Sequence, residues 1–323
     1  MKSRVNRPNR SISKMGKVIV TGGAGFIGSH LSDELVRRGY QVTIIDNLST
    51  GKLSNIESVP GSKKVEFVRG SITNLPLLRK LFSGADYIFH QAAIPSVPNS
   101  IKNPKASHNT NITGTLNVLL AARDNNVKKV VYASSAAVYG DSPTLPKTED
   151  MIPNPLSPYA ITKLAGEYYG KVFQEIYGVK TVSLRYFNVY GPRQDPNSPY
   201  AAVIPLFITE ALAGKSPVIF GNGEQSRDFA FVKDVARANI LAAESQATGI
   251  FNIGSSTRVT VNHLVQLIVS LAGNGAIKPV YKDARPGDIM HSVADITKAR
   301  AFGYSPEYGL EEGLQEVIKY MGR

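Results

Sequence analysis

A glycine-rich segment near the start of the chain constrains its fold more than any other feature. The segment, TGGAGFIG at 21–28, follows an apolar run at 18–20 and opens onto a helical pattern that continues to Gly39. Glycines at this spacing let a backbone turn sharply, approach a pyrophosphate closely and pack a helix against a strand. The start of such a helix also offers free N–H groups to phosphates. The segment therefore predicts a dinucleotide-binding unit; the alternative is a tight turn in an α/β domain that binds nothing.

An acidic residue supports the binding interpretation. Asp46 ends the next predicted strand, 41–45, where the ribose of a bound dinucleotide needs a hydrogen-bond acceptor for its 2′-hydroxyl. A carboxylate at this place also repels a 2′-phosphate. The sequence therefore predicts NAD, and not NADP, as the cofactor.

Strands and helices alternate along the first half of the chain, which is typical of a parallel sheet with helices on both faces. The strands that follow are expected at 65–69, 86–90, 129–134 and 181–185, and the helices at 74–82, 106–123 and 158–177. Beyond Arg185 the loops lengthen, and helices are expected at 203–213, 232–247 and 261–271. The fold class predicted is α/β: a Rossmann-type doubly wound parallel sheet with a smaller α/β substrate-binding lobe.

The same pattern suggests how the chain is divided. We expect a basic disordered tail at 1–14, an NAD-binding Rossmann domain at 15–185 to which 228–255 returns, and a substrate-binding lobe made of 186–227 and 256–323. In a parallel sheet, ligands gather at the carboxyl ends of the strands, and the glycine loop and Asp46 each close a strand.

Composition excludes several kinds of site. The chain has no cysteine, which excludes disulfides, thiolate metal sites and a thiol nucleophile. Its five histidines are scattered, so we expect no metal site. No apolar run reaches the roughly 18 residues of a membrane span, and the start lacks the apolar core of a secretory signal. We expect a cytoplasmic protein with no membrane partner.

Five of the twelve net positive charges lie at the start of the chain. No acidic residue precedes Asp33, and the tail carries Lys2, Arg4, Arg7, Arg10 and Lys14. Such a tail is either a contact for nucleic acid or an acidic membrane, or a solubilising extension. We expect the second, and no nucleic-acid partner, because no aromatic or glycine-rich pattern accompanies the charges. The remaining positive charge suits an anionic small-molecule substrate.

Tyr159 and Lys163 lie four residues apart, on one face of the expected helix 158–177. Free tyrosine, with a pKa of about 10, is a poor base at neutral pH, and a lysine one turn away favours the phenolate. A phenol tuned in this way is a competent general acid or base. Ser134 and Ser135 close the fifth strand and are placed to hydrogen-bond the same substrate oxygen. The alternative is an ordinary pair of side chains on a helix surface.

Together, these features resemble the extended short-chain dehydrogenase/reductase family over residues 15–323. Within it, the chain looks most like the nucleotide-sugar 4-epimerases, the UDP-glucose/galactose and UDP-N-acetylglucosamine 4-epimerase group. The motifs that carry the resemblance are TGGAGFIGSH at 21–30, DNLSTG at 46–51, HQAA at 90–93, YASSAAVYG at 132–140, YAITK at 159–163, LRYFNVYGPRQ at 184–194, SRDFAFVKD at 226–234 and RPGDIMHSVAD at 285–295.

The resemblance implies reversible epimerisation at C4 of a UDP-hexose. Tyr159 would accept the proton of the sugar 4-hydroxyl while C4 gives a hydride to bound NAD, Ser135 would assist, and Lys163 would bridge the nicotinamide ribose. The 4-keto sugar would then turn over and take the hydride back on its other face. NAD would therefore act as a tightly held prosthetic group.

The resemblance also assigns binding residues. Two guanidiniums, Arg227 and Arg285, would suit the diphosphate, and Phe220 would neighbour the uracil. The cofactor-binding set implied is Gly22, Gly25, Phe26, Ile27, Gly28, Asp46, Asn47, Ser49, Thr50, Gly51, Ser71, Ile72, Ala92, Ala93, Asn111, Tyr159, Lys163, Tyr186 and Val189. The substrate-binding set implied is Ser96, Ser135, Tyr159, Asn188, Gln194, Ala202, Val203, Phe220, Arg227, Arg285, Asp288 and Ser292.

Departures from the family pattern bear on the substrate. Ser71 stands where many members carry an aspartate against the adenine, and Pro95 where some galactose epimerases carry a lysine. Ala136 and Ala137 occupy the places of the Asp-Glu pair of related 4,6-dehydratases, which disfavours dehydration. The alternatives left are a UDP-glucuronate 4-epimerase or decarboxylase and, from another class, a non-catalytic NAD-binding scaffold.

Two further expectations concern specificity and assembly. The resemblance places Ser292 beside the sugar C2 substituent, where galactose-only members carry a tyrosine, and Ala202 on the same side. The space left predicts that UDP-GlcNAc and UDP-GalNAc are accepted along with UDP-glucose and UDP-galactose. The helices at 106–123 and 158–177 carry apolar residues on more than one side, so we expect a homodimer, formed in the resembling enzymes as a four-helix bundle.

Overall fold

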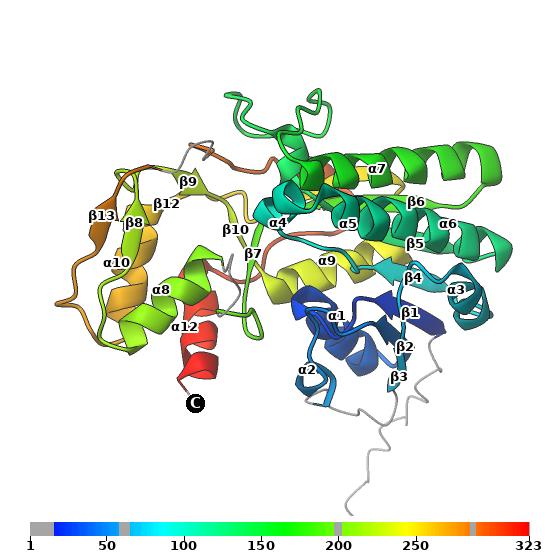
Figure 1. Cartoon of the computed structure of the whole chain (residues 1–323), viewed down its shortest axis with the longest axis horizontal. Helices are drawn as coiled ribbons and strands as arrows, with labels where there is room; N and C mark the ends of the chain where they lie inside the picture. The colour runs from blue at the N-terminus through cyan, green and yellow to red at the C-terminus, as the bar shows by residue number, and fades with distance from the viewer. Residues whose placement is uncertain (1–15, 58–64, 197–201, 285–288, 323) are drawn as a thin grey trace, which may run out of the picture.

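The computed structural model describes residues 16–57, 65–196, 202–284 and 289–322. Within these residues, a seven-stranded parallel sheet has the order β11-β6-β5-β4-β1-β2-β3 (Figure 1). Its strands are β1 (Lys17–Thr21), β2 (Gln41–Asp46), β3 (Val65–Arg69), β4 (Tyr87–His90), β5 (Lys129–Ser135), β6 (Thr181–Tyr186) and β11 (Gly249–Ile253). The strand order reverses between β1 and β4, where ligands bind in sheets of this kind. The predicted fold class is confirmed.

Helices cover both faces of the sheet because successive strand residues point to opposite sides. Val18 and Val20 of β1 belong to one apolar core and Ile19 to another. One face is covered by α1 and α9, which pack against each other, and the other by α3, α6 and α7 (Figure 1). These helices are α1 (Phe26–Arg37), α3 (Leu75–Leu81), α6 (Gly114–Asp124), α7 (Pro158–Tyr177) and α9 (Val232–Glu244).

The later part of the chain builds a third apolar core beside the sheet (Figure 1). Ile204, Leu264 and Leu314 from three helices meet in it, with the short pairs β7·β10, β8·β13 and β9·β12 around them. The elements are α8 (Val203–Leu212), α10 (Val261–Leu271), α12 (Leu310–Met321), β7 (Asn188–Tyr190), β8 (Val218–Phe220), β9 (Ser226–Arg227), β10 (Phe229–Phe231), β12 (Val259–Thr260) and β13 (Val280–Lys282). The smaller elements are α2 (Ser54–Glu57), α4 (Val97–Lys102), α5 (Pro104–His108), η2 (Asn109–Thr113), η3 (Ala136–Tyr139) and α11 (Thr297–Arg300).

Local signals in the sequence explain α7, the helix with the expected catalytic pair. Ser157 precedes it and accepts a hydrogen bond from the N–H of Ala160 (3.1 Å), and Pro158 occupies the first helical position. Gly178 ends the helix with a φ of +71°, a conformation that glycine adopts without strain. The bounds are those expected from the sequence.

Two other helices differ from their expected bounds. The helix expected at 106–123 begins at Pro104 and contains the π-helical turn η2 between α5 and α6. The helix expected at 232–247 ends at Glu244, where the Lys129 Nζ donates hydrogen bonds to the carbonyl oxygens of Ala242 (2.9 Å) and Ser245 (2.6 Å). The ammonium group of a residue in β5 thus binds carbonyl oxygens at the end of α9. The periodicity of apolar residues along the helix cannot reveal this contact.

The remaining differences are small. Strands β2, β5 and β6 each run one residue beyond the expected end, β4 begins one residue later, and α3 and α8 are shorter by a residue at one or both ends. In the residues that the structure describes, none of the helices combines the length and apolar character needed to cross a bilayer.

Candidate active site

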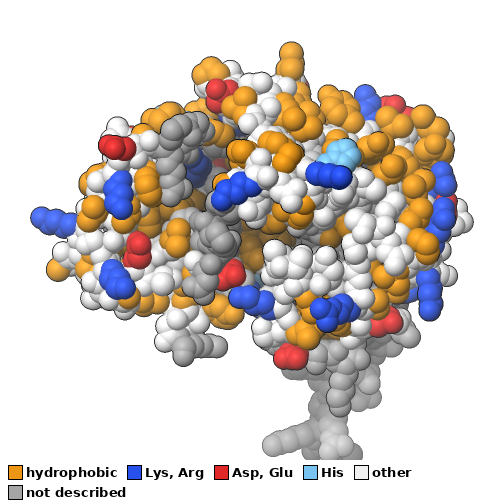
Figure 2. All heavy atoms as spheres, viewed as in Figure 1, with side chains coloured by type: hydrophobic (Ala, Val, Ile, Leu, Met, Phe, Trp, Pro, Cys, Tyr) orange, Lys and Arg blue, Asp and Glu red, His pale blue; other side chains and the backbone are white. Residues whose placement is uncertain are grey.

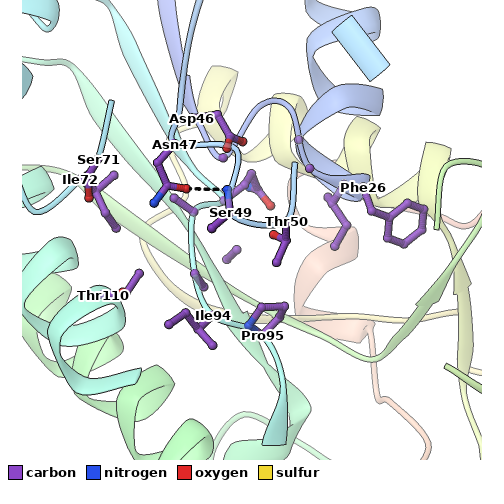
Figure 3. Close-up of a pocket in the computed structure, with 18 of the residues that line it drawn as sticks. Phe26, Asp46, Asn47, Ser49, Thr50, Ser71, Ile72, Ile94, Pro95 and Thr110 are labelled. Atoms are coloured by element: carbon purple, nitrogen blue, oxygen red, sulfur yellow. Dashed lines mark hydrogen bonds between the residues drawn. The ribbon is translucent and has the colours of Figure 1, made fainter. Parts of the chain in front are cut away.

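A cavity of about 490 Å³ opens at the carboxyl ends of the strands, beside the strand-order reversal. Side chains from the loops after β1, β2, β3 and β4 surround it (Figure 3). The glycine loop forms one wall because it packs closely on its neighbours: a Cβ at Gly22 would lie 2.7 Å from the Ala92 backbone, and one at Gly28 would lie 2.2 Å from the Gly22 carbonyl oxygen. Larger residues cannot keep this geometry.

Asp46 presents its carboxylate to the same cavity. Its Oδ2 accepts a hydrogen bond from the N–H of Ala24 in the glycine loop (3.0 Å), and its Oδ1 accepts one from the N–H of Leu48 (2.8 Å). Each oxygen retains a second lone pair, so the group remains an acceptor for a ribose hydroxyl. The glycine cradle and this fixed negative charge fit a dinucleotide without a 2′-phosphate.

The structure gathers most of the expected cofactor residues around this cavity. Those that line it are Gly22, Gly25, Phe26, Ile27, Gly28, Asp46, Asn47, Ser49, Thr50, Ser71, Ile72, Ala92, Ala93, Tyr159, Lys163 and Tyr186. The expected cofactor-binding set did not include the lining residues Ile45, Gly70, Gln91, Ile94, Pro95, Asn99, Thr110, Ala133 and Ser134, although Ser134 was expected to bond the substrate oxygen. Gly70 and Gln91 directly follow a strand, and Ile45, Ala133 and Ser134 lie near the carboxyl end of one; this position at a strand end is the signal that could have identified them.

Three expected cofactor residues do not line the cavity. Gly51 lies behind the loop, where a Cβ would meet Ala24 and Asp46 at 2.9 Å each, and Val189 lines a second cavity. Asn111 is buried, and its amide bonds the Ile94 backbone at both N–H and C=O (2.8 and 3.1 Å) and Thr162 Oγ1 (3.0 Å). In this structure it therefore holds the cavity wall in place, and its contact with the cofactor stays a prediction.

Tyr159 and Ser135 meet where β5 ends and α7 begins. The N–H of Tyr159 donates to Ser100 Oγ of α4 (3.0 Å), which fixes the first turn of α7. Ser135 Oγ also accepts from the N–H of Ala137 (3.2 Å). Burial raises the pKa of the Tyr159 phenol, and the hydrogen bond with Ser135 acts in the opposite direction.

Lys163, on the same helix as Tyr159, is hydrogen-bonded to the backbone of β5. Its Nζ donates a hydrogen bond to the carbonyl oxygen of Ala133 (2.7 Å) and lies 5.8 Å from the centroid of the Tyr159 ring. Burial lowers the pKa of Lys163 to about 7. That Lys163 favours the phenolate of Tyr159 stays a prediction.

A buried ion pair supports the catalytic strand end and was not found from the sequence. Arg185 donates to both carboxylate oxygens of Glu167 (2.9 and 2.7 Å), and Ser134 Oγ donates to Glu167 Oε1 (2.5 Å). The two charged side chains are at most 2% exposed. Glu167 follows Lys163 by one further turn of α7, and this spacing is the signal that could have placed it beneath the site.

A second cavity of about 260 Å³ lies in the smaller lobe. Six of the expected residues line it: Asn188, Val189, Ala202, Val203, Phe220 and Arg227. Its other walls are mainly apolar and come from α8, β8, β10 and α10. An apolar slot with one guanidinium suits a planar base joined to an anionic group.

Other expected substrate residues lie outside both sets of lining residues. Ser96 caps α4 by accepting from the N–H of Asn99 (3.1 Å), and Gln194 donates to the carbonyl oxygen of Val189 (3.2 Å). Ser292 is half-buried, and its N–H donates to the carbonyl oxygen of Ser226 (3.1 Å). Arg285 and Asp288 lie outside the described residues.

The chain is similar to known nucleotide-sugar epimerases in sequence and in structure. The family model described as "NAD dependent epimerase/dehydratase family" matches residues 18–254. A UDP-glucose 4-epimerase of Mycolicibacterium smegmatis is 38% identical over 308 residues, which cover 94% of this chain and 98% of the relative.

Two solved structures are similar over nearly the whole fold. A UDP-N-acetylglucosamine 4-epimerase from Methanobrevibacter ruminantium, in complex with UDP-N-acetylmuramic acid, has a TM-score of 0.92 and 46% identity, covering 95% of this chain and 98% of that one. A UDP-glucuronic acid 4-epimerase from Bacillus cereus, in complex with UDP-glucuronic acid and NAD, has a TM-score of 0.87 and 34% identity, covering 95% and 99%.

Proposed function

Because this chain belongs to the NAD dependent epimerase/dehydratase family, we propose that it is a UDP-sugar 4-epimerase that inverts the configuration at C4 of a UDP-hexose. The observation that supports this most is that Tyr159, hydrogen-bonded to Ser135, lines a cavity whose other wall carries Asp46. A protein that only binds NAD needs the carboxylate but not a buried phenol and hydroxyl in contact.

NAD, when bound, supplies a hydride acceptor that returns the hydride later in the same turnover. Tyr159 takes the proton from the sugar 4-hydroxyl and gives it back, because its phenol lies at the start of α7, lines the cavity and is hydrogen-bonded to Ser135. Ser135 holds the same sugar oxygen through its hydroxyl. Lys163 lines the cofactor cavity and would hold the nicotinamide ribose.

The second cavity is where we place the UDP portion. Phe220 offers a ring for the uracil, and Arg227 offers a guanidinium for the diphosphate. We also propose that residues 15–185 with 228–255 form the NAD-binding domain and that 186–227 with 256–323 form the substrate lobe. A hollow between the two parts of the molecule is visible in Figure 2, which would let a sugar reach both sites.

The sugar is the finer part of the proposal. We infer that N-acetylated sugars, UDP-GlcNAc and UDP-GalNAc, are substrates together with UDP-glucose and UDP-galactose. Ser292 is small and half-buried, and it is adjacent to the strand that carries Arg227. Dehydration is disfavoured because η3 opens with Ala136 and Ala137, which supply no acid to remove a C5 proton.

Product analysis tests the activity. The purified protein is mixed separately with UDP-GlcNAc, UDP-glucose and UDP-glucuronic acid, and the products are separated by chromatography. We expect the C4 epimers of the first two. Conversion of UDP-glucuronic acid alone would instead identify a glucuronate 4-epimerase, and a UDP-pentose product would identify a decarboxylase. Retention of NAD with no product from any sugar would support the non-catalytic scaffold.

Ser292→Tyr tests the sugar assignment. A phenol ring should fill the space for an acetamido group, so activity on UDP-GlcNAc should fall by about 10²-fold or more while activity on UDP-glucose is kept, because a packed wall does not yield easily to extra atoms. Ser270→Tyr is the matched control, since Ser270 is exposed on α10. Equal losses on both sugars would show that position 292 does not select the substrate.

A further inference from the structure

The residue that follows Arg227 in the sequence carries a buried carboxylate, and this carboxylate accepts four hydrogen bonds. Asp228 is fully buried. Its Oδ1 accepts from the N–H and the hydroxyl of Ser255 (2.6 and 2.7 Å), and its Oδ2 accepts from the N–H groups of Ser256 and Ala294 (both 3.0 Å). Three of the four donors are backbone groups, so the carboxylate fixes the course of the chain in two separate segments.

These two segments flank the strand that carries Arg227. On one side, the turn at 255–256 leads into β12, where Val259 pairs with Arg227. Ser256 has a φ of +60°, a conformation that a non-glycine residue adopts only when held. One hydrogen bond to Asp228 Oδ2 provides that support.

On the other side of β9 lies the segment that ends at Ala294. Ser226 donates its N–H to the carbonyl oxygen of Met290 (2.8 Å) and accepts from the N–H of Ser292 (3.1 Å). Arg227 Nη1 reaches the Met290 carbonyl oxygen as well (3.4 Å). Ser256 Oγ also donates to the carbonyl oxygen of Ala294 (3.0 Å), so the two flanks are joined to each other.

An ionised carboxylate is the only common side chain of this size that accepts four hydrogen bonds without offering a donor. An asparagine would place an NH₂ group against one pair of donors and leave buried N–H groups without an acceptor, which is costly. A substitution at this position would therefore release one flank of β9 while leaving the rest of the lobe in place.

We propose that Asp228 is a positioning residue that sets Arg227 and the segment 290–294 at a fixed separation, and so determines affinity for the diphosphate of the substrate. The proposal rests on the proposed function, because it takes the second cavity as the UDP site. Under this proposal Asp228 does not contact the substrate. Its effect passes through the backbone to Arg227, which lines the second cavity.

The test is Asp228→Asn, with UDP binding measured by isothermal titration calorimetry on the NAD-containing protein. We expect the Kd for UDP to rise on the order of tenfold. In turnover, KM for the UDP-sugar should rise while kcat stays near the unmodified value, because Tyr159 and Ser135 are not held by Asp228. NAD content after denaturation should be unchanged.

Asp234→Asn is the matched control. Asp234 is also buried and accepts two backbone N–H bonds, from Glu307 (3.0 Å) and Tyr308 (3.2 Å), but these tie the chain before α12 to α9. The Asp234→Asn variant should lower the Tm to a degree comparable with Asp228→Asn and leave the Kd for UDP unchanged. An equal rise of Kd in both variants would show a general loss of stability and overturn the proposal.

The remaining outcomes separate the two hypotheses. Absence of UDP binding by the unmodified protein would remove the proposed function itself. Binding by the unmodified protein, with a Kd for Asp228→Asn within about twofold of it, would overturn the positioning role alone. If Asp228→Asn does not fold, Ser255→Ala decides, since it removes the hydroxyl bond to Asp228 together with the bond that the N–H of Thr257 donates to the same hydroxyl (3.2 Å); an unchanged Kd there overturns the role.

Discussion

At the scale of single residues, the hydrogen bond that a charged side chain makes depends on the acceptor nearest to it in the folded protein, and not on its spacing along the helix. Tyr159 and Lys163 share one face of α7, yet the Lys163 ammonium is directed to the carbonyl oxygen of Ala133 in β5. A buried ammonium group is costly unless it is hydrogen-bonded, and the carboxyl end of β5 supplies the acceptor. Tyr159 is left with Ser135 as its hydrogen-bonding neighbour, and burial raises the pKa of its phenol.

Removing the Tyr159 hydroxyl should therefore remove turnover and little else. We expect Tyr159→Phe to lower kcat by about 10²–10⁴-fold, the usual contribution of a general acid or base, and to retain bound NAD because the ring stays in the cavity wall. Activity is measured by epimer formation, and NAD content is measured after denaturation. The control is Tyr320→Phe, at a half-exposed tyrosine on α12. More than half of the activity remaining in Tyr159→Phe would exclude Tyr159 as the acid and base.

At the scale of elements, α7 has two different apolar faces. One face lies close to the sheet: a Cβ at Gly166 would come within 2.4 Å of the Tyr132 ring, and Gly170 faces Thr181. The other face is exposed and carries Ile161, Tyr168, Val172 and Ile176. Hydrophobic side chains gather over α6 and α7 in the space-filling view (Figure 2). Exposed apolar surface of this kind indicates a partner surface.

We propose that two copies of the chain pair through α6 and α7, and light scattering at micromolar concentration tests this. The unmodified protein should have the mass of a dimer. Val172→Lys should raise the dimer dissociation constant on the order of tenfold or more, because a charge would be buried at the centre of the interface. Leu212→Lys is the control, since Leu212 is exposed to a similar degree on α8. A monomer mass for the unmodified protein would contradict the proposal.

At the scale of the whole molecule, two buried histidines join segments that are far apart in the sequence. His90 is hydrogen-bonded to Thr21 (2.8 Å) and Thr115 (2.9 Å), and His30 is hydrogen-bonded to the carbonyl oxygen of Pro192 (2.9 Å). Burial lowers the pKa of His90 to about 3 and that of His30 to about 4. Both side chains are therefore neutral in the folded protein at pH values where an unfolded chain would protonate them.

This difference predicts a loss of stability in mild acid. Because the folded pKa values lie below the unfolded value of about 6.5, the unfolded chain binds more protons between pH 6.5 and 4. The free energy of unfolding should therefore decrease as the pH is lowered through that window, by up to about 1.4 kcal/mol per pH unit for each histidine. Urea unfolding at pH 7, 6 and 5 measures the slope.

Variants separate the histidines from other groups. His90→Gln should reduce the slope between pH 6.5 and 5, because the amide can keep both threonine contacts without titrating. The control is His263→Gln, at an exposed position on α10. A slope unchanged in His90→Gln would mean that other groups cause the acid sensitivity.

Much of the sheet and of the cofactor site could be predicted because the signals are local. The glycine loop, the helix start at Ser157–Pro158 and the strand that ends at Asp46 each depend on residues within a few positions of one another. Strand ends then converge at one edge of a parallel sheet by geometry alone, so residues marked at those ends meet without further information.

Only the tertiary structure decided which residues that are distant in the sequence become hydrogen-bond partners. Asn111 faces Ile94, Lys163 faces Ala133, and Asp228 joins Ser255 to Ala294. A side chain with several possible partners takes the one that packing brings within about 3 Å in a dry interior. That choice depends on how whole elements pack, and no window of sequence contains it.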